Sequence, residues 1–381
     1  MKKLVFIAFV GVLALIQNNA FAQKITSPPS GDNQKASVTQ YMGFVEVTIT
    51  YNSPDVHGPK GEDRTGKIWG ELVPYGTKNL HFGYSSEENP SPWRAGANEN
   101  TTISFSEDVL INGNRLEAGT YGLFMEPGEK EWVIIFSKNS TSWGAYFYKK
   151  SEDALRITVT PKKTDFHEFL TYEFTERKLE SCKAWMKWEH LGVNFKVEIP
   201  DVTELYLNKM RQELRSDAGF QWQNWVTAAN FCVQNKTNLD EALTWATVAI
   251  EGKYVGEVNF TTLQTKGLVL LAMGDYEKAS AYILKAVKHP TASSGKVHQF
   301  GRGLIKKGYN ELAMEVFKAN YKKNNGAWPT NVGMARGYSA LGQYSTAAKY
   351  VKKALKIVPD EGNKQNLQKA LILLKEGKDI N

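Results

Sequence analysis

The feature that most constrains this chain is a repeat of 34 residues in its second half. Three glycines are each followed five positions later by an alanine, and successive pairs are 34 residues apart: Gly274 and Ala279, Gly308 and Ala313, Gly342 and Ala347. Another small residue precedes each of these glycines by seven positions: Gly267, Gly301 and Ala335. Because small side chains at fixed positions let two helices approach closely, this spacing predicts helical hairpins stacked along the chain.

Further positions keep the same register, and the whole pattern resembles the tetratricopeptide repeat, whose period is about 34 residues. Tyrosine follows two of the glycines by two positions, and alanine follows them by twelve: Tyr276, Tyr344, Ala286 and Ala354. An earlier stretch, residues 220–250, fits less closely, with Ala242 and Ala249 at the small positions. The resemblance implies an all-α solenoid of repeats over residues 220–362, with a linker helix at 200–219 before it and a capping helix and tail at 363–381 after it.

A solenoid of this kind implies a concave groove, formed by the first helix of each hairpin, that binds an extended peptide or a partner protein. Polar residues at groove positions are the candidates for this contact: Asn230, Gln264, Lys266 and Arg336.

The first half of the chain has a different period. Between residues 25 and 199, runs rich in β-branched and aromatic residues alternate with a period of two, at 45–51, 101–105, 131–138, 155–161 and 194–199. Asn112-Gly113 and Pro127-Gly128 lie between such runs and indicate tight turns. Short strands in series without helices between them predict an all-β domain, an antiparallel β-sandwich.

The N-terminus has the features of a secretory signal peptide over residues 1–22. Lys2 and Lys3 precede an apolar run at residues 4–16 that is too short to span a bilayer, and Ala20-Phe21-Ala22 forms a small-x-small cleavage site before Gln23. The residue directly after the cleavage site is Gln23 and not cysteine, which argues against a lipid anchor. We expect a periplasmic or secreted protein.

Charge is distributed unevenly between the two halves. Residues 23–200 carry 20 Lys and Arg against 24 Asp and Glu, a net charge of −4, whereas residues 201–381 carry 25 against 16, a net charge of +9. Exported proteins seldom meet nucleic acid, so we expect no nucleic-acid partner. The counterpart of the basic half is then an acidic peptide, an anionic envelope polymer or the acidic domain itself, unless the charge is simply a solvated surface.

Cys182 and Cys232 are the only cysteines, and they lie in different predicted domains. The alternation of "SCKAWMKWE" places Cys182, Ala184, Met186 and Trp188 on one face of a strand, which predicts a buried free thiol. The alternative is a disulfide between the domains.

Four segments of the first half occur in the order typical of one bacterial exported family. They are "TYNSPDVHGPKGEDRTGKIWGELVPYG", "PWRAGANENTTISF", "LINGNRLEAGTYGLFMEPGEKEWVIIFSK" and "WGAYFY". Residues 25–198 therefore resemble the family known as domain of unknown function 2911. The resemblance implies a domain and a bacterial origin, but no activity, substrate or cofactor.

The segment "PWRAGANENTTISF" at residues 92–105 offers a candidate site. Arg94 could bind an anion, Asn98 could act as an oxyanion donor and Glu99 as an acid or base, with Glu71 or Asp55 as a second carboxylate. Alternatively, Arg94 and Glu99 form an ion pair and Asn98 caps a tight Ala-Gly-Ala turn. The sequence alone leaves both interpretations open.

The remaining motifs give little indication of a metal, cofactor or catalytic site. The six histidines have no metal-ligand spacing, "GEDRTGK" lacks the spacing of a phosphate-binding loop, and no G-x-S-x-G motif is present, so we expect neither a metal nor a cofactor. Tryptophans that could line a sugar-binding face, or else pack within the sandwich, are Trp69, Trp93, Trp143 and Trp185.

Taken together, these features favour a non-catalytic exported protein, a binding or scaffold protein whose tetratricopeptide repeats dock a protein partner. The alternatives place a hydrolase-like active site, or a carbohydrate-binding or small-ligand site, around Arg94, Asn98 and Glu99 in the β-domain.

Overall fold

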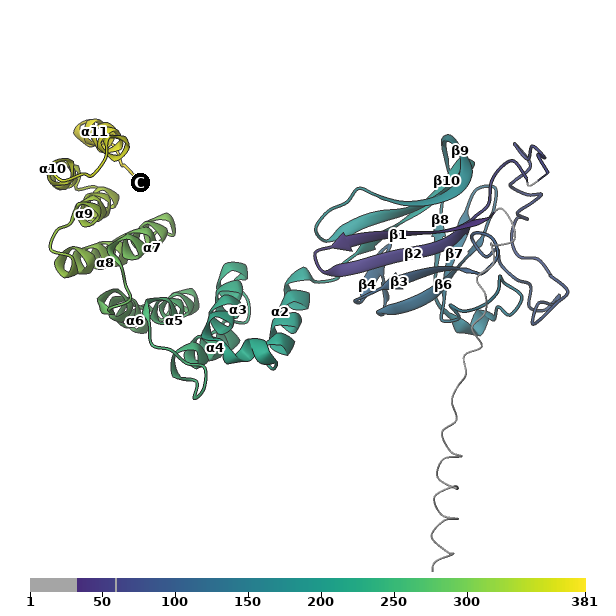
Figure 1. Ribbon diagram of the computed structural model, residues 1–381, viewed down its shortest axis with the longest axis horizontal. Coiled ribbons are helices and arrows are strands. Elements are labelled where there is room, and N and C mark those ends of the chain that lie inside the picture. Colours follow the sequence, from purple (N-terminus) through teal and green to yellow (C-terminus); the bar gives the residue numbers. More distant parts are fainter. Residues whose placement is uncertain (1–32, 59) are drawn as a thin grey trace, which may run out of the picture. The chain divides into compact units, whose positions relative to one another are not determined.

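The computed structural model describes residues 33–58 and 60–381, which form two compact units that divide between Pro200 and Asp201 (Figure 1). The expected signal peptide at residues 1–22 lies outside the described residues. Among the described helices, none combines the length and apolar character that a bilayer crossing requires.

The first unit is an antiparallel β-sandwich, as its alternating pattern predicted. Its six-stranded sheet has the order β1 (Gln34–Met42), β2 (Val45–Ser53), β3 (Thr101–Phe105), β6 (Gly119–Glu126), β7 (Trp132–Ser137) and β8 (Asp153–Val159). Its four-stranded sheet has the order β5 (Asn114–Leu116), β4 (Val109–Ile111), β10 (Ser181–Glu198) and β9 (Lys162–Thr175). The turn at Asn112-Gly113 joins β4 to β5 with φ angles of 47° and 83°, the left-handed conformation that a type I′ turn requires.

The core of the sandwich lies between the two sheets. The predicted inner face of β10 is confirmed, because Cys182, Ala184, Met186 and Trp188 are each at most 1% exposed. From the other sheet, Phe136 of β7 contacts Phe195 of β10 with ring centres 5.4 Å apart. Both cysteines are free and buried, so the disulfide alternative is wrong.

The second unit contains ten α-helices within the described residues. They are α2 (Val202–Glu213), α3 (Trp222–Asn235), α4 (Leu239–Glu251), α5 (Phe260–Met273), α6 (Tyr276–Lys288), α7 (Ser294–Lys306), α8 (Asn310–Lys323), α9 (Trp328–Ala340), α10 (Tyr344–Leu355) and α11 (Glu361–Lys375). Successive helices form hairpins that stack side by side, as Figure 1 shows from α3 to α11.

The 34-residue period corresponds to the hairpins α5–α6, α7–α8 and α9–α10. Gly274, Gly308 and Gly342 follow the first helix of each hairpin with φ angles of 85°, 84° and 72°, a left-handed conformation that glycine adopts without strain. The small residues seven positions earlier allow close packing. A Cβ atom on Gly267, for example, would lie 2.6 Å from Cγ1 of Ile283 in the partner helix.

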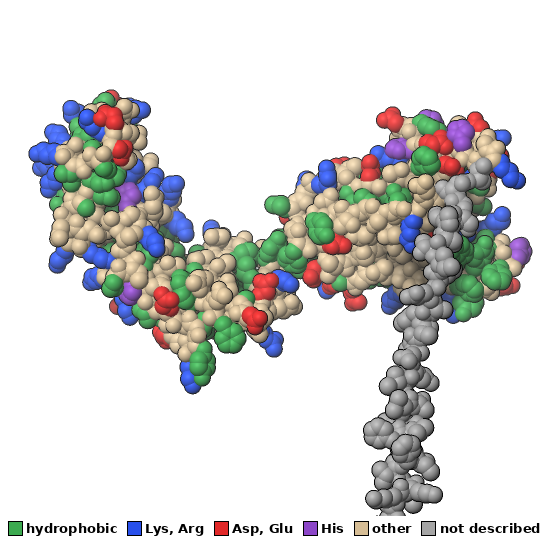
Figure 2. Space-filling view, in the orientation of Figure 1, with side chains coloured by type: hydrophobic (Ala, Val, Ile, Leu, Met, Phe, Trp, Pro, Cys, Tyr) green, Lys and Arg blue, Asp and Glu red, His purple; other side chains and the backbone are tan. Residues whose placement is uncertain are grey.

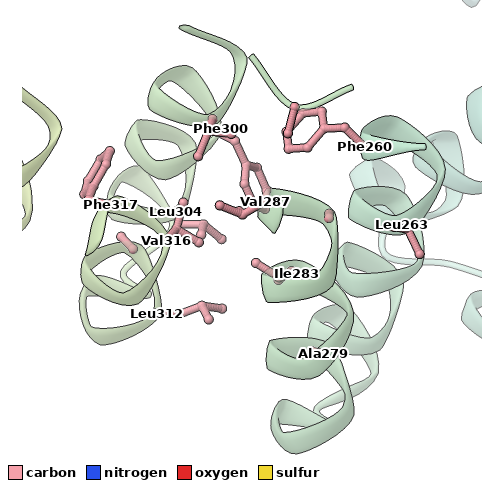
Figure 3. Close-up of a cluster of buried hydrophobic side chains, with 14 of the residues drawn as sticks. Phe260, Leu263, Ala279, Ile283, Val287, Phe300, Leu304, Leu312, Val316 and Phe317 are labelled. Atoms are coloured by element: carbon pink, nitrogen blue, oxygen red, sulfur yellow. The ribbon is translucent and has the colours of Figure 1, made fainter. Parts of the chain in front are cut away.

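Apolar side chains from neighbouring hairpins interlock in a continuous core (Figure 3). Ile283 and Val287 of α6 lie between side chains of α5 and those of α7 and α8, and both are fully buried. Each hairpin therefore buries its apolar face on its neighbours, which is the source of stability in a repeat protein.

Two predicted helices differ in length from their sequence ranges. The helix expected at 200–219 corresponds to α2, which begins after the N-cap Asp201 and ends at Glu213; a 3₁₀ turn at Asp217–Phe220 follows. The sequence explains why α2 ends before residue 219, because Ser216, Asp217 and Gly219 favour turns over helix interiors. The helix expected from residue 363 begins earlier, at Glu361, after the N-cap Asp360.

Candidate functional site

Arg94 lies in the turn before β3 and is held by the protein itself. Its Nη1 donates to the Asn98 carbonyl oxygen at 2.7 Å, and its guanidinium lies 5.6 Å from the centre of the Tyr146 ring. The guanidinium also contacts Gly144, where a Cβ atom would come within 2.6 Å of Cζ. Arg94 thus fastens the turn to the loop that carries Tyr146.

Glu99 faces different partners. Its carboxylate accepts a hydrogen bond from Asn52 Nδ2 at 2.8 Å, and Lys35 Nζ lies 3.9 Å away. The predicted ion pair between Arg94 and Glu99 is therefore wrong, because the turn directs the two side chains to opposite neighbours. The Glu99 side chain is 44% exposed, so solvent screens its charge.

The turn itself is stabilised from its interior. The Ala95 carbonyl oxygen accepts hydrogen bonds from Thr101 Oγ1 at 2.9 Å and from the Tyr172 hydroxyl at 2.8 Å. Asn98 adopts a φ of 55°, and its Nδ2 reaches the Asn33 carbonyl only at 3.5 Å. The prediction that the Asn98 side chain caps the turn is wrong, since Thr101 and Tyr172 have that role.

The structure does not assemble the hydrolase constellation. A cavity of about 200 Å³ is lined by Trp93 and Arg94, but neither Asn98 nor Glu99 lines it. Of the two possible second carboxylates, Glu71 is exposed and Asp55 belongs to a bridge with Phe169 on β9. In the part of the chain that the structure describes, no group of three His, Cys, Asp or Glu side chains could hold a metal ion.

The candidate tryptophans do not share one face. Trp69 and Trp93 pack edge to face with ring centres 5.7 Å apart, and Trp69 also contacts the buried Trp132 and Trp188 at 4.9 and 5.8 Å. Elsewhere, Trp143 is 57% exposed. Trp185 of β10 interacts with the amino groups of two lysines, Lys162 and Lys187.

The largest concentration of positive charge lies in the later repeats. Residues 261–381 contain 20 Lys and Arg against 8 Asp and Glu, a net charge of +12. Figure 2 shows lysine and arginine side chains crowded over the C-terminal helices of the solenoid. An acidic ligand would therefore be attracted to this part of the helical unit.

A cavity of about 620 Å³, here called the α9 pocket, lies among α7, α9 and α11. Three cations line it: Arg302 of α7, Arg336 of α9 and Lys369 of α11. Apolar lining comes from Trp328, Val332, Leu367 and Leu373. The described residues that line the pocket include no Asp or Glu. Its volume is within the roughly 300–1,000 Å³ usual for ligand sites.

Burial alters the charges at the base of this pocket. Burial, with Arg336 and Arg302 nearby, lowers the pKa of His298 to about 4, so this histidine is neutral at physiological pH. Burial also lowers the pKa of Arg336, and the neighbouring Arg302 lowers it further. The Nε atom of Arg336 is buried without a hydrogen-bond partner among the described residues. Arg336 is thus a desolvated cation with incomplete compensation.

The other predicted groove residues have different settings. Gln264 of α5 lines a cavity of about 570 Å³ that shares Gly295 and Gln299 of α7 with the α9 pocket. Lys266 is mostly buried over the Tyr282 ring, with Nζ 3.8 Å from Glu251. Asn230 of α3 is half-buried and lines neither cavity. The structure therefore brings Gln264 and Arg336 to one connected groove, and not the other two.

Two pocket residues that the sequence analysis missed could have been found in it. Arg302 precedes Arg336 by 34 residues, and His298 follows Gln264 by the same interval, so each occupies the equivalent position of the neighbouring repeat. Lys369 gave no such signal, because α11 lies outside the period.

Comparisons with known proteins agree with this architecture. Residues 33–197 match the family model described as "Protein of unknown function (DUF2911)", and residues 260–288 match a tetratricopeptide repeat model. Both resemblances drawn from the motifs are confirmed. No curated protein matches the chain.

Several solved structures resemble the helical unit. YrrB, described as a TPR protein with an unusual peptide-binding site, is 21% identical, with 44% of this chain and 84% of that chain covered and a TM-score of 0.28. The C-terminal part of a TPR protein from Cytophaga hutchinsonii is 14% identical, with coverage of 46% and 67% and a TM-score of 0.32. A putative kinesin light chain repeat structure from Podosopora anserina is 15% identical, with coverage of 41% and 85% and a TM-score of 0.29.

Proposed function

Because the chain joins a DUF2911 domain to tetratricopeptide repeats, we propose that it is an exported, non-catalytic scaffold whose helical groove docks a protein partner. Export rests on the signal-peptide features of residues 1–22. Arg94 and Glu99 each bind a different part of the β-domain and do not face a shared cavity, which favours binding over catalysis.

The observation that carries the proposal is the connected groove along the first helices of the hairpins. Two cavities of about 620 and 570 Å³ meet at Gly295 and Gln299 of α7 and extend from α5 to α11. Their lining combines apolar and cationic side chains, which suits an extended polypeptide better than a small rigid ligand.

Site-specific crosslinking in the producing cells tests this function. A photoreactive amino acid at Gln299, which lines both cavities, should give an adduct with one defined envelope protein. The matched control is the same amino acid at Lys318, an exposed position on α8, the second helix of the same hairpin. If both positions give the same adducts, or neither gives any, the groove is not the docking surface.

Export is tested separately by cell fractionation and N-terminal sequencing. The mature chain should be found outside the cytoplasm and begin at Gln23. A cytoplasmic chain with an intact N-terminus would contradict this part of the proposal.

A further inference from the structure

The α9 pocket already holds a short segment of this chain. Residues 378–381, here called the tail segment, follow α11 and fold back onto α9, and Ile380 lines the pocket. Arg336 Nη1 donates to the Ile380 carbonyl oxygen at 2.9 Å, and Asn381 Nδ2 donates to the Arg336 carbonyl oxygen at 3.1 Å. The pocket thus accepts extended backbone through hydrogen bonds to α9.

The tail segment also places one carboxylate on α9. Ser339 Oγ donates to Asp379 Oδ1 at 2.6 Å and accepts from the Ile380 amide at 3.1 Å. The Asp379 charge acts on Arg336 from nearby and raises its pKa, opposing the larger effect of burial. An acidic residue followed by an aliphatic one is therefore the pattern that α9 recognises in its own chain.

This internal occupant leaves two cations of the pocket without an acid. Arg302 donates from Nη1 to Gln299 Oε1 at 3.3 Å, and neither Arg302 nor Lys369 forms an ion pair with a carboxylate of the described residues. Because Arg302 also repels Arg336, an added carboxylate between them would relieve an unfavourable interaction. Asp379 is the one acidic side chain of the tail segment and is already bound by Ser339, so the side chains of this segment provide no second acid.

We propose that the α9 pocket binds an extended acidic segment of the partner protein, and that the tail segment is its internal competitor. In the bound segment, an acidic and an aliphatic residue replace Asp379 and Ile380 against Ser339 and Arg336. A further carboxylate of the segment pairs with Arg302 and Lys369. This inference rests on the proposed docking function and specifies the chemistry of the partner.

A peptide is favoured over a simple anion by the rest of the lining. Trp328, Val332 and Leu373 provide an apolar wall beside the cations, which an inorganic phosphate would leave unused. Arg336 donates to the Ile380 carbonyl oxygen and Ser339 accepts from the Ile380 amide, so α9 binds backbone groups of the tail segment as well as its carboxylate.

The experiment compares the chain over residues 23–381 with a variant that lacks residues 378–381. Two fluorescent, C-terminally amidated peptides serve as probes: Gly-Lys-Asp-Ile-Asn, which copies residues 377–381, and Glu-Glu-Asp-Ile-Asn, which adds acids for Arg302 and Lys369. Fluorescence anisotropy should show the acidic peptide binding at least about tenfold more tightly to the shortened chain than to the full chain, because the internal competitor is gone.

Two substitutions in the shortened chain separate specific pairing from general attraction. Arg302→Gln should remove the advantage of the acidic peptide, while Gly-Lys-Asp-Ile-Asn still binds as before. The matched control Lys349→Gln, which removes one charge from an exposed position of α10, should change neither affinity more than about twofold. Circular dichroism at 222 nm confirms that each variant keeps its helices.

A full-length variant guards against misfolding of the shortened chain. The double substitution Asp379→Asn and Ile380→Ser keeps the chain length but weakens the tail contacts, and it should also tighten binding of the acidic peptide. The inference is overturned if the acidic peptide binds full and shortened chains equally, or binds no more tightly than Gly-Lys-Asp-Ile-Asn.

Two further results distinguish the possible failures. If the full chain forms a concentration-dependent dimer that disappears without residues 378–381, the pocket belongs to a second copy and the partner segment is wrong. If crosslinking at Gln299 captures a partner but the acidic peptide fails these tests, docking stands and only its assignment to the α9 pocket falls.

Discussion

The packing around Phe317 gives a sharp test of the small-residue period. Phe317 of α8 is fully buried, and its ring lies among three glycines of the neighbouring first helices, Gly301, Gly333 and Gly337. A Cβ atom on Gly333 would lie 2.7 Å from Cδ1 of Phe317, whereas unstrained carbon contacts are about 3.5–4.0 Å. Glycine is thus required at residue 333 because the Phe317 ring leaves no room for a Cβ atom, and not because the helix backbone needs glycine there.

The effect of Gly333→Ala should therefore depend on residue 317. Alone, Gly333→Ala should lower the free energy of unfolding by about 1–2 kcal/mol, because overpacking of about 1–3 kcal/mol exceeds a gain in helix propensity of up to about 1 kcal/mol. Phe317→Ala should lower it by about 3–5 kcal/mol through the cavity it leaves. Added to Phe317→Ala, Gly333→Ala should become stabilising, since only the propensity gain and some filling of the cavity remain.

Urea unfolding followed by circular dichroism at 222 nm, which reports mainly on the helices, measures this cycle. Gly303→Ala in α7 is the matched control, because a Cβ atom on Gly303 would meet no heavy atom of the described residues within 4 Å. This substitution should stabilise the protein by about 0.5–1 kcal/mol. If Gly333→Ala costs the same in both backgrounds, the clash with Phe317 does not explain the glycine.

Three further measurements test the β-domain and the thiols. The Glu168 carboxylate hydrogen-bonds to His57 and raises the pKa of this histidine above 6.5, so an NMR titration should find an elevated His57 pKa that Glu168→Gln lowers. The stability that this pair contributes is present below the pKa of His57 in the unfolded chain and is lost as the pH rises through the pKa of His57 in the folded protein. Burial raises the pKa values of Cys182 and Cys232 to about 11, so both thiols should react with an aromatic disulfide reagent only after unfolding; rapid reaction in the native state would contradict their burial. Thr101→Val should cost about 1 kcal/mol in urea unfolding, since one hydrogen bond to the Ala95 carbonyl is lost while another remains; no change would mean that this hydroxyl does not hold the turn.

The strands that the sequence pattern revealed are those with runs of β-branched and aromatic residues. Alternation identified the cores of β2, β3, β7 and β8 and both ends of β10, but gave no sign of β1 and β9. These two strands are edges of their sheets, as is β8, but β1 has few apolar residues: exposed Ser37 and Thr39 alternate with half-buried Ala36, Val38 and Gln40. An edge strand with so few apolar residues is specified by backbone pairing with its neighbour, which residue periodicity does not record.

The turn that contains Arg94 and Glu99 shows that the sequence also fails to predict some side-chain contacts. Sequence proximity suggested that Arg94 and Glu99 would pair, yet their partners come from the loop of Tyr146 and from β1 and β2. Ala95 and Asn98, which lie between Arg94 and Glu99, both have a left-handed φ, and the backbone reversal there sends the two flanking side chains in different directions. Residues close in sequence are therefore poor predictors of contact where the backbone reverses.

In the solenoid, periodicity predicts more because each hairpin repeats the same geometry. The position before Gly274, Gly308 and Gly342 by six residues holds Leu268, Arg302 and Arg336 in successive repeats. Leu268 lines the cavity beside α5, and the two arginines line the α9 pocket, so this repeat position changes from apolar to cationic along the groove. The period thus places the arginines on one surface, but only the structure shows that residues 378–381 return to that surface. We therefore expect a partner that binds the α9 pocket to displace the chain's own tail segment.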